Sequence, residues 1–157
     1  MTADIVRVEE VAWDHPDADY LRQQQRLDIA DRYERVDSEP GTPPTADDIT
    51  CFCVAYQDSR PVGCGGLRRL DQHSAELKRM FVIKEARGKG AANAVLEFLE
   101  QKSLALGIRR LLLETGDKLV EAHRFYTRSG YKIIPNFGYY AGVETSICME
   151  KLLETPI

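Results

Sequence analysis

Two glycines in a short basic segment near the middle of the chain could bind an anion. Residues 87–92 read Arg-Gly-Lys-Gly-Ala-Ala, and they follow an expected strand and precede an expected helix. The first N–H groups of a helix have no partner inside the helix, and the helix dipole makes that end positive, so they attract phosphate. Gly88 and Gly90 allow a close approach of the backbone, while Arg87 and Lys89 add positive charge. The segment predicts a phosphate site; a plain strand-to-helix turn is the alternative.

Two familiar phosphate loops do not fit this segment. A dinucleotide-binding loop follows the first strand of its domain and needs a glycine or alanine three residues after its second glycine. Here the segment lies at mid-chain, and that position is Asn93. A nucleoside-triphosphate loop needs Ser or Thr directly after Gly-Lys, whereas Lys89 is followed by Gly90. The expected phosphate therefore belongs to a different ligand.

The charge of the chain is unevenly distributed. Its 21 basic and 25 acidic side chains give a net charge of −4, which argues against general nucleic-acid binding. Residues 1–48 carry a net charge of −8, so residues 49–157 carry +4. Between positions 78 and 90, five basic side chains accompany a single acidic one, Glu85. We expect an anionic ligand at this basic segment; a solvated basic surface is the alternative.

Hydrophobic periodicity predicts a set of strands and helices that would position this segment. Strands are expected at residues 5–11, 50–56, 62–70, 74–83, 108–115, 131–134 and 145–153. Helices are expected at residues 17–36, after residue 90 as far as Gly107, and at residues 119–129, with an exposed loop at residues 37–48. The early strands pair antiparallel by default, and the strand-helix-strand unit in the middle forms a crossover. The predicted fold class is α+β, with a mixed central sheet of about six to seven strands flanked by helices.

Length and composition predict one domain over residues 1–157, located in the cytoplasm. The 157 residues suffice for one core, and the longest apolar runs are too short to span a membrane. The acidic N-terminus does not resemble a signal peptide. The four cysteines, which lie in apolar segments without a CxxC pair or metal-ligand spacing, are Cys51, Cys53, Cys64 and Cys148. We expect them to be buried thiols of a reducing compartment, with no metal site.

Three motifs in sequence resemble the GNAT family of N-acetyltransferases. Residues 87–92 match the pyrophosphate loop of that family, Arg/Gln-x-x-Gly-x-Gly/Ala. Residues 76–82 are similar to the strand that precedes the loop, and residues 122–126, Ala-His-Arg-Phe-Tyr, followed by Gly130, resemble its second conserved helix. The resemblance spans about residues 50–153 and implies a GNAT-like acyl-CoA N-acyltransferase fold.

The resemblance is closest to a group of family members with two further signatures. One is a strand ending in Leu-Glu-Thr-Gly, here residues 113–116, and the other is Phe-Gly-x-Tyr, here residues 137–140. One position departs from the family pattern, because Ala91 is smaller than the aliphatic residue usual there. Helix packing at that point would differ without affecting the N–H donors.

The resemblance implies that acetyl-CoA binds in a V between the strand ending near Val82 and the strand ending near Thr115. Backbone groups of residues 80–82 would bond the pantetheine arm, and the N–H groups of residues 87–92 the pyrophosphate. Lys84 and Lys89 would face the remaining phosphate. The residues expected to contact acetyl-CoA are Met80, Phe81, Val82, Arg87, Gly88, Lys89, Gly90, Ala91, Ala92, His123 and Tyr126.

Acetyl transfer to an amine needs a base, a stabilised oxyanion and a proton for the departing thiolate. A primary ammonium with a pKa of roughly 10.4 is mostly protonated at pH 7, so a carboxylate is the expected base. Glu76, on the strand beside the thioester, is the first candidate, and Glu114, on the neighbouring strand, is the second. Tyr126 resembles the family tyrosine that protonates the sulfur, and His123, three residues earlier, is a surface histidine or a cofactor contact.

The acceptor is specified only by charge. If the acidic N-terminal part borders the cleft, it favours a cationic amine such as a polyamine, an amino-acid derivative, an aminoglycoside or a lysine side chain. Selectivity is expected from residues 20–48 and from Tyr139, Tyr140 and Glu144. The main prediction is an acetyltransferase with a small-molecule or peptide amine as acceptor, acting by direct attack. A non-catalytic acyl-CoA-binding module is the alternative, and a homodimer is expected only by analogy.

Overall fold

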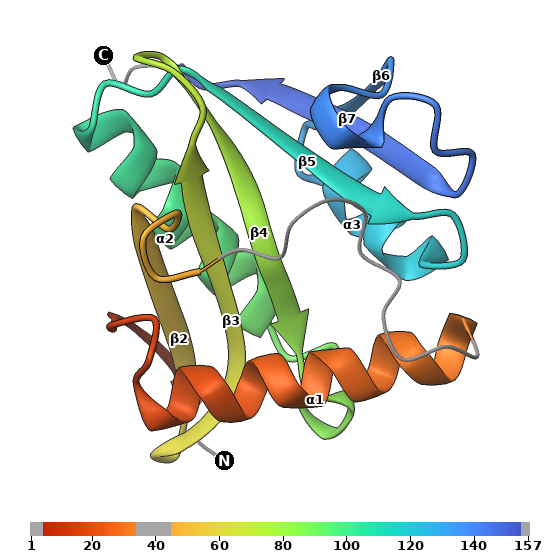
Figure 1. Ribbon diagram of the computed structural model, residues 1–157. Helices are drawn as coiled ribbons and strands as arrows, with labels where there is room; N and C mark the ends of the chain where they lie inside the picture. The colour runs from red at the N-terminus through yellow and green to blue at the C-terminus, as the bar shows by residue number, and fades with distance from the viewer. Residues whose placement is uncertain (1–4, 34–44, 155–157) are drawn as a thin grey trace.

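The computed structural model describes residues 5–33 and 45–154, which form one mixed sheet with helices on both sides (Figure 1). The strands are β1 (Val6–Glu10), β2 (Cys51–Gln57), β3 (Arg60–Arg69), β4 (Ser74–Val82), β5 (Arg110–Gly116), β6 (Lys132–Ile134) and β7 (Ser146–Leu152). The helices are α1 (Pro16–Tyr33), α2 (Ala91–Ala105) and α3 (Val120–Arg128), with two short 3-10 turns, η1 (Lys84–Ala86) and η2 (Gly138–Tyr140). The predicted strands, helices and α+β class are confirmed. Most of the predicted loop at residues 37–48 lies outside the described residues.

The sheet splits between its two central strands. The strand order is β1-β2-β3-β4-β5-β7-β6, and β4 and β5 are the parallel pair, joined by the crossover through α2. Their pairing covers three positions and ends where Glu76 lies beside Leu112. Beyond that point β4 runs on to Val82 and β5 to Gly116 without pairing to each other, and the two strands diverge (Figure 1). The expected V between these strands is therefore present.

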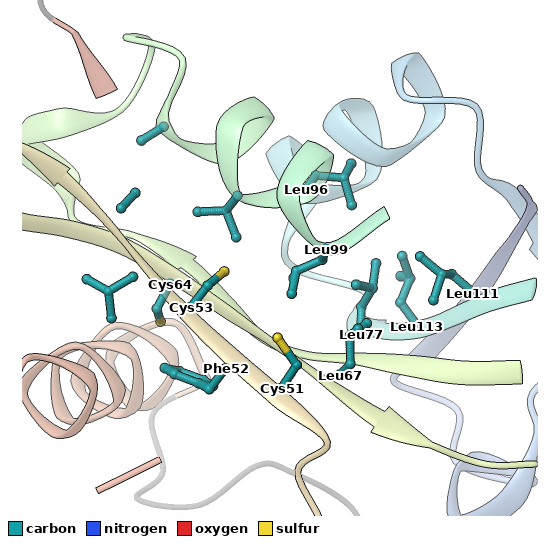
Figure 2. Packing of buried hydrophobic residues seen from close by; sticks show 14 of the residues in the cluster. Cys51, Phe52, Cys53, Cys64, Leu67, Leu77, Leu96, Leu99, Leu111 and Leu113 are labelled. Carbon is teal, nitrogen blue, oxygen red and sulfur yellow. The ribbon is translucent and has the colours of Figure 1, made fainter. Parts of the chain in front are cut away.

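The helices cover opposite faces of the sheet. In Figure 1, α1 crosses in front of the strands, whereas α2 and α3 lie behind them. The main core lies between the sheet and α2, where leucines of β3, β4 and β5 meet those of the helix (Figure 2). Its labelled leucines are Leu67, Leu77, Leu96, Leu99, Leu111 and Leu113. All four cysteines are buried free thiols, as the sequence predicted.

A bulge in β4 sets the direction of the strand end. Arg79 has a left-handed backbone, with φ of 59°, and the pairing of β3 with β4 shifts in register between Cys64 and Gly66. A Cβ atom added at Gly65 would lie 2.5 Å from the Met80 sulfur, so only glycine leaves room for that side chain. The glycines of β3 thus mark a bulge and a close approach, which places Met80 at the mouth of the split.

None of the helices within the described residues combines the length and the apolar character that crossing a bilayer requires.

Candidate active site

A cavity of about 490 Å³ passes through the split between β4 and β5. One wall comes from α1, through Gln25, Asp28 and Ile29, and the opposite wall comes from α3 and includes Tyr126. Because α1 and α3 lie on opposite faces of the sheet, the cavity connects the two faces (Figure 1). Its floor is the end of β4, residues 80–82. Such a site can hold an elongated ligand with a different group at each end.

The glycine loop forms the end of this cavity nearest α2. Gly88 and Gly90 have left-handed backbones, with φ of 80° and 92°, and a Cβ atom added at either would meet no protein atom within 4 Å. Backbone conformation, rather than crowding, therefore selects glycine at both positions. Arg87, Gly88, Gly90, Ala91 and Ala92 line the cavity, as does Asn93, whereas Lys89 is not among the lining residues. The first N–H groups of α2 thus face open space, the arrangement expected of a phosphate site.

Two carbonyls at the end of β4 already accept hydrogen bonds from side chains. Gln25 Nε2 donates to the Met80 carbonyl at 3.1 Å, and Arg87 Nε donates to the Val82 carbonyl at 3.0 Å. Arg87 also pairs with Asp28 of α1 at 3.6 Å. Gln25 is 8% exposed, and its Oε1 atom is buried without a hydrogen-bond partner. Helix α1 is therefore tied to the strand at which the pantetheine arm was expected.

Tyr126 lies in the wall formed by α3. It is 6% exposed, its ring packs against the rings of Phe125 and Tyr131, and it lines the cavity. Burial raises the pKa of Tyr126, so the phenol keeps its proton. His123, three residues earlier, does not line the cavity: its Nε2 atom lies 2.9 Å from the carbonyl oxygen of Gly116, at the end of β5.

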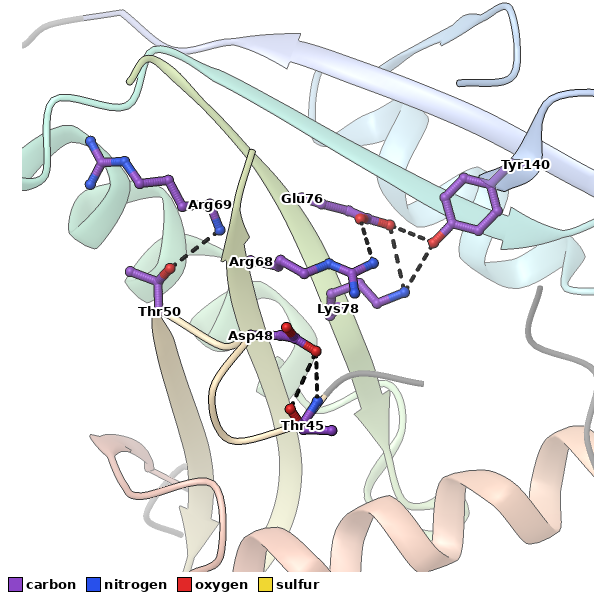
Figure 3. Close-up of polar contacts among 8 residues, drawn as sticks. All are labelled: Thr45, Asp48, Thr50, Arg68, Arg69, Glu76, Lys78 and Tyr140. Carbon is purple, nitrogen blue, oxygen red and sulfur yellow. Dashed lines mark hydrogen bonds and ion pairs between the residues drawn. The ribbon is translucent and has the colours of Figure 1, made fainter. Parts of the chain in front are cut away.

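Glu76 lies at the vertex of the split, on the face of the sheet opposite the leucine core. The residue is 2% exposed, and both oxygens of its carboxylate have donors (Figure 3). Arg68 Nη2 donates to Oε1 at 3.1 Å, the hydroxyl of Tyr140 donates to Oε2 at 2.5 Å, and Lys78 Nζ lies 3.6 Å from Oε2. The carboxylate is thus the centre of a buried polar cluster in which each oxygen accepts a hydrogen bond.

Glu114 lies beyond the vertex on the same face of β5 as Leu112, two residues away. Ser146 of β7 donates a hydrogen bond to Glu114 Oε2 at 2.6 Å. The register pairs Glu114 with Cys148, whose pKa is raised first by burial and further by the charges of Glu114 and Glu76. The two candidate bases therefore lie on one face of the sheet, on either side of the split.

Comparison with known proteins identifies the family to which this site belongs. A sequence model of the acetyltransferase (GNAT) family matches residues 6–131. The chain belongs to the GNAT family of acetyltransferases. An "IAA acetyltransferase" of Azospirillum brasilense is 36% identical over 104 residues, which cover 65% of this chain and 67% of that protein.

Solved structures of other acetyltransferases share the fold. An acetyltransferase of the GNAT family from Staphylococcus aureus superposes with a TM-score of 0.77 at 20% identity, covering 96% of this chain and 100% of that one. A GNAT family acetyltransferase from Elizabethkingia anophelis, solved with acetyl-CoA bound, superposes with a TM-score of 0.69 at 16% identity, covering 94% and 98%. The acyl donor of this acetyltransferase is acetyl-CoA, as the sequence predicted. The chain is an acetyl-CoA-dependent N-acetyltransferase.

Two parts of this acetyltransferase site were not predicted from the sequence. One is the choice of side chains within the expected range 20–48: Gln25, Asp28 and Ile29 of α1 share a helix face at spacings of three and four residues. A polar residue on the buried stripe of a helix is the signal that could have identified Gln25. The other is the polar cluster around Glu76, whose partners Arg68 and Tyr140 come from separate strands and loops.

The described part of the acetyltransferase offers no metal centre. Within residues 5–33 and 45–154, there is no group of three or more His, Cys, Asp or Glu side chains that could hold a metal ion.

Proposed function

We propose that this acetyltransferase moves the acetyl group of acetyl-CoA directly to a primary amine of a small molecule or peptide. The observation that carries the proposal is the cavity through the split of the sheet. It joins the glycine loop, the end of β4 and Tyr126 in one continuous wall. Glu76 does not line the cavity; it lies on β4 at the point where the pairing with β5 ends. A donor bound along this wall would present its thioester near the point where the two faces of the sheet meet.

The donor would be held mainly by backbone groups. Residues 80–82 bond the pantetheine arm, and the N–H groups of residues 87–92 bond the pyrophosphate, with Lys89 contributing charge from the loop. The left-handed glycines and the open space in front of them support this assignment. His123, which lies against the end of β5, contacts the donor only at the edge of the site.

Glu76 and Tyr126 would carry out the proton transfers. Glu76 accepts a proton from the acceptor ammonium, and the neutral amine attacks the thioester carbonyl carbon. The C–N bond forms as the tetrahedral intermediate appears, and its positively charged nitrogen loses a second proton to solvent. Collapse of the intermediate then breaks the C–S bond, and Glu76 releases its proton to solvent after turnover. Tyr126 then gives its proton to the thiolate and recovers one from solvent. Glu114 is the second candidate for the base, since it lies on the same face across the split.

The acceptor would be cationic. Residues 1–48 hold 13 of the 25 acidic side chains of the chain, and their net charge of −8 favours a polyamine, an amino-acid derivative, an aminoglycoside or a lysine side chain. Among the residues expected to select the acceptor, Tyr139 is 65% exposed, whereas Tyr140 is buried against Glu76. Tyr139 is therefore placed to touch an acceptor, and Tyr140 to act through the carboxylate.

A panel of amines tests this proposal. Release of coenzyme A is measured with spermidine, lysine, kanamycin and a lysine-containing peptide, and with glutamate as an acceptor of opposite charge. We expect release with at least one cationic amine, and a loss of about 10²-fold in the Glu76→Gln variant. A preference for glutamate would contradict the charge argument. Binding of acetyl-CoA without acetylation of any amine would favour the alternative, a non-catalytic acyl-CoA-binding module.

Domain organisation, location and oligomeric state complete the proposal. We propose that residues 1–157 form a single domain that acts in the cytoplasm, without a nucleic-acid or membrane partner. The buried free thiols support a reducing compartment. A homodimer, proposed by analogy with folds of this kind, is tested by light scattering at several protein concentrations.

A further inference from the structure

The loop between β6 and β7 carries a motif that brings a buried phenol to the proposed base, Glu76. Residues 137–140 read Phe-Gly-Tyr-Tyr, and two neighbouring tyrosines differ sharply in environment. Tyr139 is 65% exposed, whereas Tyr140 is 2% exposed. Gly138, with φ of 53°, begins the turn η2 that directs Tyr140 inward. The loop therefore inserts one phenol beside the sheet.

Several contacts hold this loop in place. Asn136 Nδ2 lies 3.1 Å from each of three backbone carbonyl oxygens, those of Tyr140, Val143 and Ser146. The ring of Phe137 meets the ring of Tyr140 edge to face, with centroids 5.3 Å apart. The N–H of Tyr140 donates to the Phe137 carbonyl at 2.9 Å. A loop tied together at its base in this way fixes the position of the phenol oxygen.

The phenol oxygen stands between two charged groups. Lys78 Nζ donates to it at 3.0 Å, and the phenol donates in turn to Glu76 Oε2 at 2.5 Å (Figure 3). An O–H···O⁻ hydrogen bond of about 2.5–2.7 Å is in the strong, charge-assisted range. Of these two donors to the Glu76 carboxylate, Arg68 keeps its proton, so the phenol of Tyr140 is the one that can pass a proton to it.

We propose that Tyr140 relays the proton of the acceptor amine to Glu76, an inference that rests on the proposed role of Glu76 as the base. The ammonium gives a proton to the phenol oxygen while the phenol proton passes to Glu76 Oε2. One N–H bond and one phenol O–H bond break, and a new phenol O–H and a carboxyl O–H form. The neutral amine then attacks the thioester. Tyr140 is again a neutral phenol at the end of the step, because it has given up one proton and received another.

The other charged groups around Glu76 are compatible with this relay. Arg68 approaches from β3 and Lys78 from β4, while Glu114 of β5 and Cys148 of β7 lie across the split. The two cations offset the negative charge of the Glu76 carboxylate. Lys78 also stabilises the negative charge that appears on the phenol oxygen if its proton moves first.

The test uses the fastest amine of the panel and follows coenzyme A release from about pH 6 to about pH 10. Tyr140→Phe removes the hydroxyl and keeps the ring that packs on Phe137. We expect a loss of about 10²-fold at pH 7 that shrinks as pH rises, because more of the amine is already neutral and needs no base. Glu76→Gln should show the same loss at pH 7 and the same recovery at high pH. The double variant should be no slower than either single variant, because both residues act in one proton transfer. Tyr56→Phe removes another phenol that donates to a carboxylate, Asp17 Oδ2 at 2.6 Å, outside the cavity; it is the matched control and should retain its rate.

Each outcome separates the relay from the function on which it rests. A loss in Tyr140→Phe that is constant across pH, or losses that multiply in the double variant, would overturn the relay and leave Glu76 as the base. Unchanged activity in Glu76→Gln would overturn the assignment of the base itself. If none of the amines is acetylated, both the relay and the proposed transfer to an amine are contradicted. Urea unfolding of each variant at pH 7 verifies that a slow variant is still folded.

Discussion

Tyr140 and Glu76 are 64 positions apart in the chain, yet the Tyr140 hydroxyl lies 2.5 Å from Glu76 Oε2. This hydrogen bond joins β4 to the loop between β6 and β7, next to the point at which β4 and β5 stop pairing. The two sides of the split are thus connected at its vertex by a polar contact. Substitutions in the loop should therefore alter the hydrogen bonding of the Glu76 carboxylate, although no residue of the loop lies near β4 in the sequence.

Asn136→Ala should loosen this connection. The side-chain amide lies 3.1 Å from three carbonyl oxygens of the loop, and its removal leaves them without that donor. We expect the free energy of unfolding to fall by about 1–3 kcal/mol. The rate of acetylation of the fastest amine should also fall, because the loop no longer fixes the position of the Tyr140 hydroxyl. Urea unfolding and coenzyme A release provide the two measurements. Thr145→Ala, at an exposed position of the same loop, is the control, and equal effects of the two variants would contradict the role of Asn136.

Gly90→Ala and Gly107→Ala form a matched pair at the two ends of α2. Both glycines have left-handed backbones, with φ of 92° and 78°, and an added Cβ would meet no atom within 4 Å at either position. Each variant should lose about 1–2 kcal/mol of stability, the cost of the left-handed conformation. Only Gly90→Ala should weaken coenzyme A binding, by about tenfold, because it redirects the N–H groups of the loop. Calorimetry with coenzyme A measures the difference, and equal affinities would argue against the phosphate site.

The elements of the fold could be predicted from local pattern, and so could the ligand-binding loop. The helix after residue 90 was expected to extend as far as Gly107, and the φ of 78° at Gly107 is the left-handed conformation with which helices commonly end. The apolar strand at residues 108–115 became the buried β5, Arg110–Gly116. The sequence interpretation of α1 was less successful. Hydrophobic residues are expected to face the core, yet Leu27 of this helix is 65% exposed, whereas the polar Gln25 is buried. Hydrophobic periodicity identifies buried apolar side chains, so it does not identify a buried glutamine whose amide is bonded to a strand carbonyl.

The environment of Glu76 could not be predicted for a different reason. Its donors Arg68, Lys78 and Tyr140 converge through the pairing of β3 with β4 and through a loop far along the chain. A pattern in one segment contains no information on which distant side chain will meet it. The residue type of Glu76 therefore suggested a base, but the occupation of both its oxygens became visible only in three dimensions.

The buried thiols should make the fold sensitive to alkali. Burial raises the pKa of Cys51 to about 11 and that of Cys64 to about 12, from an ordinary value of 9.0. The folded state thus holds these protons more tightly than the unfolded state, so stability is complete below pH 9 and is lost as pH rises toward 11–12. Urea unfolding at about pH 8 and about pH 10 measures this loss. Cys51→Ala removes one of the titrating groups and should reduce the difference between the two pH values; an undiminished difference would exclude Cys51 as a contributor.

Tyr126→Phe should slow the step in which the thiolate leaves. The phenol is 6% exposed, and burial raises its pKa, so it remains protonated up to and beyond its ordinary value of 10.0. Turnover in the parent should therefore show no alkaline decline from this group between about pH 8 and about pH 10. Removal of the hydroxyl should lower the single-turnover rate of acetyl transfer by about 10²-fold without weakening acetyl-CoA binding.

Tyr131→Phe is the control: its hydroxyl bonds Glu100 at 2.8 Å, its ring packs on Tyr126, and it does not line the cavity. That variant should lose stability of about 1 kcal/mol but keep its rate. Equal single-turnover rates for Tyr126→Phe and the parent would show that the thiolate takes its proton from another donor.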